Sequence, residues 1–456
     1  MIMNNSEYIR AVKDIFAARE APPLCCVQSF GCQQNVNDGE RLTGVLMSMG
    51  CGVSSDPETA DIVILNTCAV RENAEQRLYG YLGELKHAKR KNPSMVLGLC
   101  GCMAQEEGTA EKVRKSYPYV DMVFGTFASD KLPELLYKVL TERRFTVDTE
   151  ERKGEIPEGR PLYRAVKYKA GVSVMYGCNN FCTFCIVPYV RGRERSRTPE
   201  SIIEEVKYLA DDGVKEIMLL GQNVNSYGRG LEEKTDFPEL LRRINAVDGD
   251  FRVRFMSPHP KDATEEFFDV IAESEKICKS IHLPLQSGSN DILRAMHRSY
   301  TREKFIKMCE YARSRYKGLS VTTDIIVGFP GETEKDFEET LDMMRLIQFD
   351  NIYSFIYSKR RGTRAAAMED STPEKEKSER MGRLLALQRE ITEQSYKRFV
   401  GNTFDVLFDG THKGLISGKS GEGIITLVKG EESLIGQMKK VWVKAAHNWA
   451  VDGEII

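Results

Sequence analysis

Three cysteines lie close together in the stretch YGCNNFCTFC, at Cys178, Cys182 and Cys185. Thiolates bind metals, but a structural zinc site is closed by four protein ligands. The nearest further candidates, His259 and Cys278, are distant in the sequence. An iron–sulfur cluster is also held by thiolates, and its protein can leave one iron open to another ligand. The spacing therefore favours a cluster over zinc, and zinc over a redox pair of two thiols.

A second set of three cysteines occurs in the first third of the chain. Cys32, Cys68 and Cys102 each come just after a short apolar run. In a parallel sheet all three would emerge at one edge, where ligands of open α/β sheets bind. Three thiolates without a fourth again indicate a cluster with an open iron. The other cysteines of this segment are expected to be small buried side chains: Cys25, Cys26, Cys51 and Cys100.

The elements that must position Cys32, Cys68 and Cys102 alternate between strand-like runs and helical patterns. Apolar runs at 24–31, 61–68 and 94–102 are separated by helix-period stretches at 38–49 and 72–90. This alternation predicts βαβ units and an open parallel α/β sheet. A polar stretch at 148–161 then has the composition of a linker.

The same alternation continues six times through the middle of the chain. The predicted strands are 171–177, 215–221, 252–257, 279–287, 319–328 and 351–358. Six consecutive units predict a partial (β/α)6 TIM-like barrel, with its active site at the C-terminal strand ends. An open doubly wound sheet is the alternative.

The last part of the chain changes character. A charged helical stretch at 372–399 precedes short, glycine-bounded, partly alternating runs within 402–456. These runs predict a small β-barrel. The predicted domains are therefore 22–147, 162–392 and 393–456.

Bulk composition agrees with a globular protein of about three domains at 456 residues. No apolar run approaches the roughly 18 residues of a membrane span, and the N-terminus has no export signal, so we expect a cytoplasmic protein without membrane contact. The net charge is −2. Any nucleic-acid surface must therefore be local.

Cys-x3-Cys-x2-Cys after the first strand of a β/α barrel resembles the signature of the radical S-adenosylmethionine (SAM) enzymes. The resemblance implies a 4Fe–4S cluster whose fourth iron is chelated by SAM, which one electron cleaves to methionine and a 5′-deoxyadenosyl radical. The segments LLGQN, LPLQSGS and DIIVGFPGE resemble the SAM-contacting segments of that superfamily. They imply cofactor contacts by Gly221, Gln222, Gln286, Val327 and Gly328, although glycines and polar residues also simply end strands.

FGCQQNVNDGE, NTCAVRENAEQR and GCMAQE, with the barrel signature and a terminal β-domain, resemble the radical SAM methylthiotransferases over nearly the whole chain. NTCAVRE, VFGT and GCNNFCTFCIVPYVRGRE resemble the MiaB-type branch, which makes 2-methylthio-N6-isopentenyladenosine at position 37 of tRNA. The resemblance implies two 4Fe–4S clusters and two SAM per turnover. One SAM methylates sulfur held at the N-terminal cluster, and the other generates the radical that attacks adenine C2. It also implies a TRAM-like terminal barrel, a tRNA anticodon stem-loop as partner, an electron donor protein and a monomer.

Two arginine-rich segments could bind tRNA phosphates. Their candidate residues are Arg191, Arg193, Arg195, Arg197, Arg360 and Arg361, and a solvated loop is the alternative for each segment. Tyr189, Tyr227 and Tyr357 could stack on a base, although ordinary packing is commoner. Two other functions stay open. One is methylthiolation of threonylcarbamoyladenosine in tRNA or of a ribosomal-protein side chain, and the other is a non-catalytic, metal-stabilised RNA-binding protein.

Overall fold

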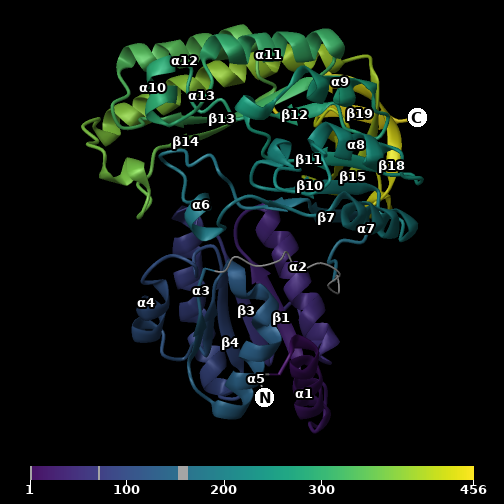
Figure 1. The fold of residues 1–456 in the computed structure, drawn as a ribbon. Coiled ribbons are helices and arrows are strands. Elements are labelled where there is room, and N and C mark those ends of the chain that lie inside the picture. The colour runs from purple at the N-terminus through teal and green to yellow at the C-terminus, as the bar shows by residue number, and fades with distance from the viewer. Residues whose placement is uncertain (1–2, 70–71, 152–162) are drawn as a thin grey trace. The chain divides into compact units, whose positions relative to one another are not determined.

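The computed structural model describes residues 3–69, 72–151 and 163–456 (Figure 1). It divides into two compact units. The first comprises Met1–Ala165, Tyr176–Asn179 and Ile186–Arg193, and the second comprises Val166–Met175, Asn180–Cys185 and Glu194–Ile456. The predicted linker at 148–161 falls mainly outside the described residues. The predicted domain limits therefore stay predictions.

The first unit is built on a parallel sheet, as the sequence predicts. Its strand order is β2-β1-β3-β4-β5-β6, and every neighbouring pair is parallel. The strands are β1(Leu24–Ser29), β2(Gly52–Val53), β3(Ile62–Thr67), β4(Val96–Gly101), β5(Met122–Phe124) and β6(Thr146–Asp148). Strands β1, β3 and β4 run side by side at its centre (Figure 1).

Helices cover both faces of this sheet. Ile64 packs in the core shared with α1(Asn5–Ala17), α2(Gln33–Ser48) and α5(Leu132–Glu142). Its neighbour Leu65 packs on the opposite face, with α3(Glu72–Lys91) and α4(Thr109–Ser116). Because both faces are buried, β3 and β4 are mostly apolar and show no alternation with polar residues.

The second unit contains the six predicted central strands. They form two three-stranded parallel sheets, β7-β10-β11 and β12-β13-β14. Val253 of β11 joins the two sheets, because its N–H donates to the Lys276 carbonyl (2.8 Å) and its carbonyl accepts from Cys278 (2.9 Å). The arrangement is an open partial barrel. The strands are β7(Lys169–Ser173), β10(Glu216–Leu220), β11(Arg252–Phe255), β12(Ser280–His282), β13(Ser320–Val327) and β14(Asn351–Ile356).

Amphipathic helices cover the outside of the partial barrel. In α7, the buried side chains Ile202, Val206 and Leu209 recur at helical spacing and face the core, and the Thr198 side chain caps the N-terminus. The helices are α7(Pro199–Asp211), α8(Phe237–Asn245), α9(Glu265–Glu273), α10(Asn290–Ala295), α11(Arg302–Arg315), α12(Glu334–Ile347) and α13(Glu374–Tyr396). Short elements also occur, namely β8(Met175–Tyr176), α6(Val187–Val190) and β9(Arg195–Ser196).

The C-terminal segment closes into a five-stranded β-barrel, as expected. Its order is β15-β16-β17-β19-β18. The strands are β15(Thr403–His412), β16(Leu415–Ser420), β17(Ile425–Val428), β18(Met438–Ala446) and β19(Val451–Ile455). Strand β19 was not expected, because only the runs that form the other four strands have a strand-like sequence. Its short, partly polar sequence carries little strand signal, and pairing with β17 and β18 makes it a strand.

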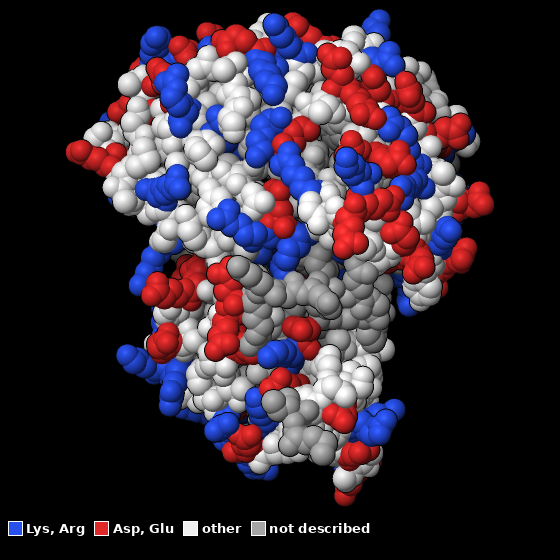
Figure 2. All heavy atoms as spheres, viewed as in Figure 1, with Lys and Arg blue, Asp and Glu red and all other residues white. Residues whose placement is uncertain are grey.

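No helix in the described part of the chain is long and apolar enough to cross a membrane. Figure 2 shows lysine and arginine interspersed with aspartate and glutamate over the face that it draws.

A buried charge network attaches this β-barrel to the partial barrel. Glu216 accepts hydrogen bonds from Arg252 (2.8 Å) and Arg254 (2.7 Å). Arg252 also donates to the Lys419 carbonyl (2.7 Å), and Arg254 donates to the Ser420 carbonyl. Glu216 and Arg252 are the first residues of β10 and β11. The C-terminal barrel therefore lies at the N-terminal ends of these strands, opposite the end where barrel active sites form.

We expect Glu216→Gln to destabilise the second unit, because it leaves two guanidinium groups buried without a carboxylate. Removing one partner of a buried pair typically costs about 3–5 kcal/mol. Urea unfolding would measure this loss. The Arg242→Ala control disrupts an exposed pair with Glu266 and should change stability by less than about 1 kcal/mol. Equal stability of Glu216→Gln and its parent would show that the network is not needed.

The same network predicts a pH dependence. Burial alone raises the pKa of Glu216, but the charges of Arg254, Arg252 and Lys169 lower it to about 2. The unfolded pKa is about 4.3, so this contribution to stability is present above that pH and is lost as the pH falls towards 2. Over that pH range the free energy of unfolding should fall more steeply for the parent protein than for Glu216→Gln. The same pH dependence in both proteins would contradict the lowered pKa of Glu216.

Candidate functional site

The three N-terminal cysteines lie at one edge of the parallel sheet, as the sequence predicts. Cys68 directly follows β3 and Cys102 directly follows β4, while Cys32 caps the N-terminus of α2 after β1. The strands β1, β3 and β4 are hydrogen-bonded neighbours. The N–H of Cys102 donates to the Thr67 carbonyl (2.9 Å), which ties the two loops together. Sheet geometry therefore brings the three thiols to one place.

The side chains of Cys32 and Cys68 interact directly. A side-chain hydrogen bond with Cys68 lowers the pKa of Cys32 to about 6, against burial and helped by the positive charge of Arg191. Gly31 permits the close approach, with a φ of +133°. A Cβ on Gly31 would lie 2.3 Å from Cys68 Cβ and 3.0 Å from its Sγ. Only glycine fits between these two loops.

Asn35 connects the strand ends to the thiols, and it is not among the residues predicted from the sequence. Its side chain is fully buried. The Nδ2 atom donates to the carbonyls of Thr67 (2.8 Å) and Phe30 (3.4 Å). The Oδ1 atom accepts from Cys32 Sγ (3.5 Å) and from Arg191 (3.0 Å). Polar residues that are buried in the first turns of α2, after Cys32, are the signal that could have marked it.

Arg191 corrects one sequence prediction. It was expected to bind phosphate, but only 5% of it is exposed. Its Nε donates to Cys102 Sγ (3.1 Å), and its terminal nitrogen pairs with Asp38 (2.8 Å). Arg197 is also buried and donates to the Ser173 carbonyl (2.9 Å) and to Glu205. The structure argues against phosphate contact by these two arginines, because both guanidinium groups are buried and bonded to protein acceptors.

The other predicted RNA contacts differ in exposure. Arg193 and Arg361 are exposed, and Arg195 and Arg360 are partly exposed. Tyr189 is exposed as well. Tyr227 is buried and donates to the Arg197 carbonyl (2.8 Å), and Tyr357 is buried beside Phe329. Ordinary packing therefore accounts for the last two tyrosines.

The other three cysteines, Cys178, Cys182 and Cys185, lie within eight consecutive residues in the loop after β7 and β8. Within the second unit, the Cys185 N–H donates to the Cys182 carbonyl (2.9 Å) in a tight turn. Arg298 is buried and donates to Cys182 Sγ (3.5 Å) and to the Pro284 carbonyl (2.6 Å). A guanidinium therefore lies beside one thiol of this set too.

The predicted SAM contacts lie at C-terminal strand ends, where barrel enzymes bind their ligands. Gly221 and Gln222 follow β10, Gln286 follows β12, and Val327 and Gly328 end β13. Gln286 has an unusual φ of +70°. Two backbone hydrogen bonds to β13 hold it there, from Gln286 N–H to Asp324 (2.8 Å) and from Ile326 N–H to Gln286 (2.9 Å). Such strain in a non-glycine residue is typical of ligand sites.

Three buried polar atoms near these strand ends have no hydrogen-bond partner among the described residues: Asn180 Oδ1, Asn223 Oδ1 and His259 Nε2. Burial and the charges of Arg298 and Lys261 lower the pKa of His259, so its ring is neutral. Its Nδ1 accepts from the Lys261 N–H (3.2 Å), so Nε2 carries the proton and can donate. Unpaired buried groups are costly. They fit a polar ligand such as SAM.

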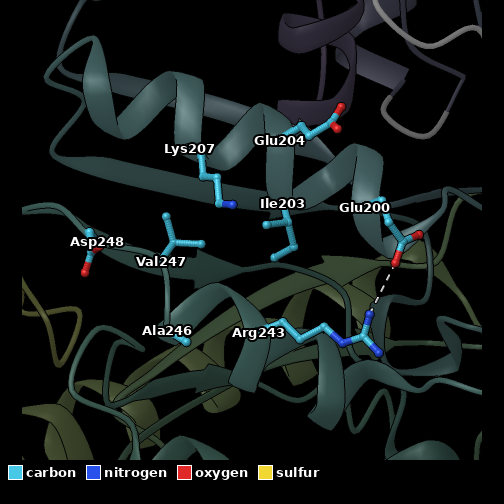
Figure 3. A pocket seen from close by; sticks show the side chains of 8 residues that line it. All are labelled: Glu200, Ile203, Glu204, Lys207, Arg243, Ala246, Val247 and Asp248. Atoms are coloured by element: carbon cyan, nitrogen blue, oxygen red, sulfur yellow. Dashed lines mark hydrogen bonds and ion pairs between the residues drawn. The ribbon is translucent and has the colours of Figure 1, made fainter.

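The hollow drawn in Figure 3 is a different place. It lies between α7 and α8, and Arg243 and Glu200 form an ion pair across it (3.4 Å). Its lining residues are Glu200, Ile203, Glu204, Lys207, Arg243, Ala246, Val247 and Asp248. None of them is a predicted site residue.

The donor atoms decide which group the two sets of thiols suit. Soft thiolates prefer iron–sulfur clusters, zinc or Cu(I) to hard cations. The described residues contain no group of three or more His, Cys, Asp or Glu that could hold a single metal ion. All twelve cysteines are free thiols, and Cys25, Cys26, Cys51 and Cys100 are buried as expected. Of the other eight, six fit clusters, which are held by thiolates: Cys32, Cys68, Cys102, Cys178, Cys182 and Cys185.

We expect Gly31→Ala to lower the iron content of the N-terminal site, because its Cβ would displace Cys68. Iron per chain after anaerobic reconstitution would measure the loss. Gly50→Ala is the matched control, since Gly50 also has a positive φ (+97°) but its nearest neighbour lies 3.9 Å away. Equal iron in both variants would mean that the position of Cys68 does not determine cluster binding.

Comparison with known proteins adds three findings. The radical SAM superfamily profile matches residues 172–344, and the profile described as Uncharacterized protein family UPF0004 matches residues 25–125. The radical S-adenosylmethionine methyltransferase TsrM from Kitasatospora setae is similar in fold, with a TM-score of 0.56, 15% identity and coverage of 87% of this chain and 81% of that one.

Curated relatives are much more similar in sequence. A tRNA-2-methylthio-N(6)-dimethylallyladenosine synthase of Clostridium novyi is 46% identical over 94% of this chain and 96% of its own. The protein of that name from Lachnoclostridium phytofermentans is 47% identical over 94% and 95%. The chain belongs to the tRNA-2-methylthio-N(6)-dimethylallyladenosine synthase family of radical SAM proteins.

Proposed function

We propose that this protein is a radical SAM methylthiotransferase that adds a methylthio group to C2 of N6-isopentenyladenosine at position 37 of tRNA. The observation that carries the proposal is the pair of three-cysteine sets, each at the C-terminal end of its own parallel strands. The names of relatives that match 94% of the chain support the substrate. Among methylthiotransferases, these names favour isopentenyladenosine over threonylcarbamoyladenosine or a ribosomal protein.

The proposed cofactors are two 4Fe–4S clusters and SAM. Cys32, Cys68 and Cys102 would hold one cluster, and Cys178, Cys182 and Cys185 the other, together with SAM. Bound SAM supplies radical chemistry, which the reaction needs because the adenine C2–H bond offers no handle to an acid or base. Gly221, Gln222, Gln286, Val327 and Gly328 are proposed SAM contacts, since they surround the strand ends that carry the unpaired polar atoms.

The protein itself contributes binding, orientation and the exclusion of water. Cys68 and Cys102 are almost completely buried, so bulk water has little access to these two thiols. His259 Nε2 would donate to an acceptor on the bound cofactor. These features support an enzyme over the alternative of a non-catalytic RNA-binding protein, because a purely structural metal does not need unpaired polar groups around it.

The proposed partners are the tRNA anticodon stem-loop and an electron donor protein. We further propose a cytoplasmic monomer. Exposed Arg193 and Arg361, with partly exposed Arg195 and Arg360, remain proposed phosphate contacts. The C-terminal barrel is attached at the far ends of β10 and β11, so RNA bound to it must extend along the second unit to reach the strand ends carrying Cys182.

The two cysteine sets should be functionally separable. The triple variant Cys32→Ala, Cys68→Ala, Cys102→Ala should still produce 5′-deoxyadenosine from SAM under reduction, because the other cluster remains. It should make no methylthiolated nucleoside, because no iron remains to hold the sulfur. Replacing Cys178, Cys182 and Cys185 should instead abolish SAM cleavage. Quantifying both products by mass spectrometry would check this.

Two controls complete that comparison. Circular dichroism must show that each triple variant is folded. The variant Cys309→Ala removes a thiol that is buried in the core of the second unit, and it should keep both products. Methylthiolated product from a folded N-terminal triple variant would reject the two-cluster mechanism. Full 5′-deoxyadenosine production by the other triple variant would reject the radical SAM assignment.

Phosphate binding should appear as salt dependence of tRNA affinity. Each phosphate neutralised contributes close to one unit to the slope of log affinity against log salt. Arg361→Ala should weaken binding and reduce that slope by about 1. Lys207→Ala, in the groove of Figure 3, is the control and should leave the slope unchanged. An unchanged slope in Arg361→Ala would remove this residue from the RNA surface.

A further inference from the structure

Arg191 is a charged residue that donates a hydrogen bond directly to one of the N-terminal thiols. Only 5% of it is exposed, and its partners Cys102, Asn35 and Asp38 all belong to the first unit with it. We propose that Arg191 is a positioning residue that sets the reduction potential of the cluster bound by Cys32, Cys68 and Cys102. The proposal rests on the proposed function, because it presumes a cluster at these thiols.

The geometry directs the guanidinium at one sulfur. Nε donates to Cys102 Sγ (3.1 Å), while one terminal nitrogen donates to both Asn35 Oδ1 (3.0 Å) and Asp38 Oδ2 (2.8 Å). A guanidinium has donors in a fixed fork and cannot be deprotonated in a protein. Acceptors on two sides therefore fix its plane, and its charge is permanent. A phosphate has no access to a donor group that is buried and occupied in this way.

Asp38 pairs with a terminal nitrogen of Arg191, whereas the Nε atom donates to the sulfur. Its carboxylate also accepts from Gln34 Nε2 (2.9 Å), and about a fifth of its side chain is exposed, at 21%. The positive charge is therefore nearer to Cys102 than the negative charge that orients it. Asp38 partly offsets that positive charge, so the two residues should affect the cluster in opposite directions.

The chemical consequence concerns one-electron reduction. Reduction places one electron from the external reductant on the cluster, so its sulfur ligands become more negative, and no bond is broken. A cationic N–H donor to a ligand sulfur stabilises that reduced state more than the oxidised state. Net charge, hydrogen bonds to sulfur and burial are the factors that set cluster potentials. Arg191 supplies the first two, and its buried site weakens screening by water.

The competing explanation is purely structural. Arg191 would then only fasten the segment 186–193 to the edge of the sheet. Its loss would reduce the amount of cluster formed, but any cluster that did form would have an unchanged potential. The potential therefore distinguishes the two explanations, whereas product yield does not.

The test uses the full chain with Cys178, Cys182 and Cys185 replaced by alanine, so that one cluster remains. After anaerobic reconstitution, a dithionite titration followed by electron paramagnetic resonance gives its potential. Arg191→Gln should lower the ratio of reduced to oxidised cluster at a fixed potential at least tenfold, which is about 59 mV for a one-electron couple. Asp38→Asn should shift the potential upwards. Arg197→Gln, another buried paired arginine, is the matched control and should not shift it.

Each outcome has a distinct meaning. If the chain that keeps only Cys32, Cys68 and Cys102 as cluster ligands binds no iron, the proposed function itself is contradicted, and the proposal for Arg191 is overturned with it. A normal iron content with equal potentials in Arg191→Gln and its parent would overturn the proposal. If Arg191→Gln fails to assemble a cluster, Arg191→Lys, which keeps the charge, and Asp38→Asn decide the question. An unchanged potential in Asp38→Asn with full iron would also overturn it.

Discussion

Neighbouring parallel strands end at the same edge of a sheet, and the chemistry of this protein depends on that constraint. It brings Cys68 and Cys102, which are 34 positions apart, to adjacent loops after β3 and β4. Cys32 joins them because α2 begins just beyond β1. The same constraint in the second unit aligns Gly221, Gln286 and Gly328, which follow three different strands. The N-terminal site therefore follows from strand order, whereas Cys178, Cys182 and Cys185 are already close in the sequence.

Burial of charge is the second feature that the two sites share. Arg191 donates to Cys102, and Arg298 donates to Cys182. Burying a guanidinium is costly unless acceptors satisfy it, and here Asp38 and the Pro284 carbonyl contribute to that role. Arg191 thus places a positive charge beside Cys102, which favours the thiolate form that binds iron and opposes the burial that raises the pKa of this thiol. The hydrogen-bonding shell around the ligands is therefore part of each site.

Sequence reasoning found the features that depend on spacing. It predicted the parallel sheet, the six central strands, the terminal β-barrel and the placement of the N-terminal cysteines after apolar runs. It failed where orientation decides. The segment RGRERSR contains four arginines in seven residues. Nothing in its composition indicates that Arg191 and Arg197 are buried while Arg193 is exposed.

Asn35 was missed, and His259 was considered only as a distant zinc ligand, for a related reason. Each is a polar residue whose role comes from the strand ends around it. Asn35 bonds to the carbonyls of Phe30 and Thr67, and His259 receives a bond from Lys261 while its other nitrogen is unpaired. Long-range contacts of this kind leave no periodic pattern. A polar residue predicted to be buried in an otherwise apolar environment is the available sequence signal.

The central claim is that two sets of three thiolates each hold a 4Fe–4S cluster. Measurement of iron and acid-labile sulfide in the anaerobically reconstituted full chain tests it most directly. The account predicts about eight iron and eight sulfide per chain, because each cluster contains four of both. About four of each, or zinc in place of iron, would contradict it.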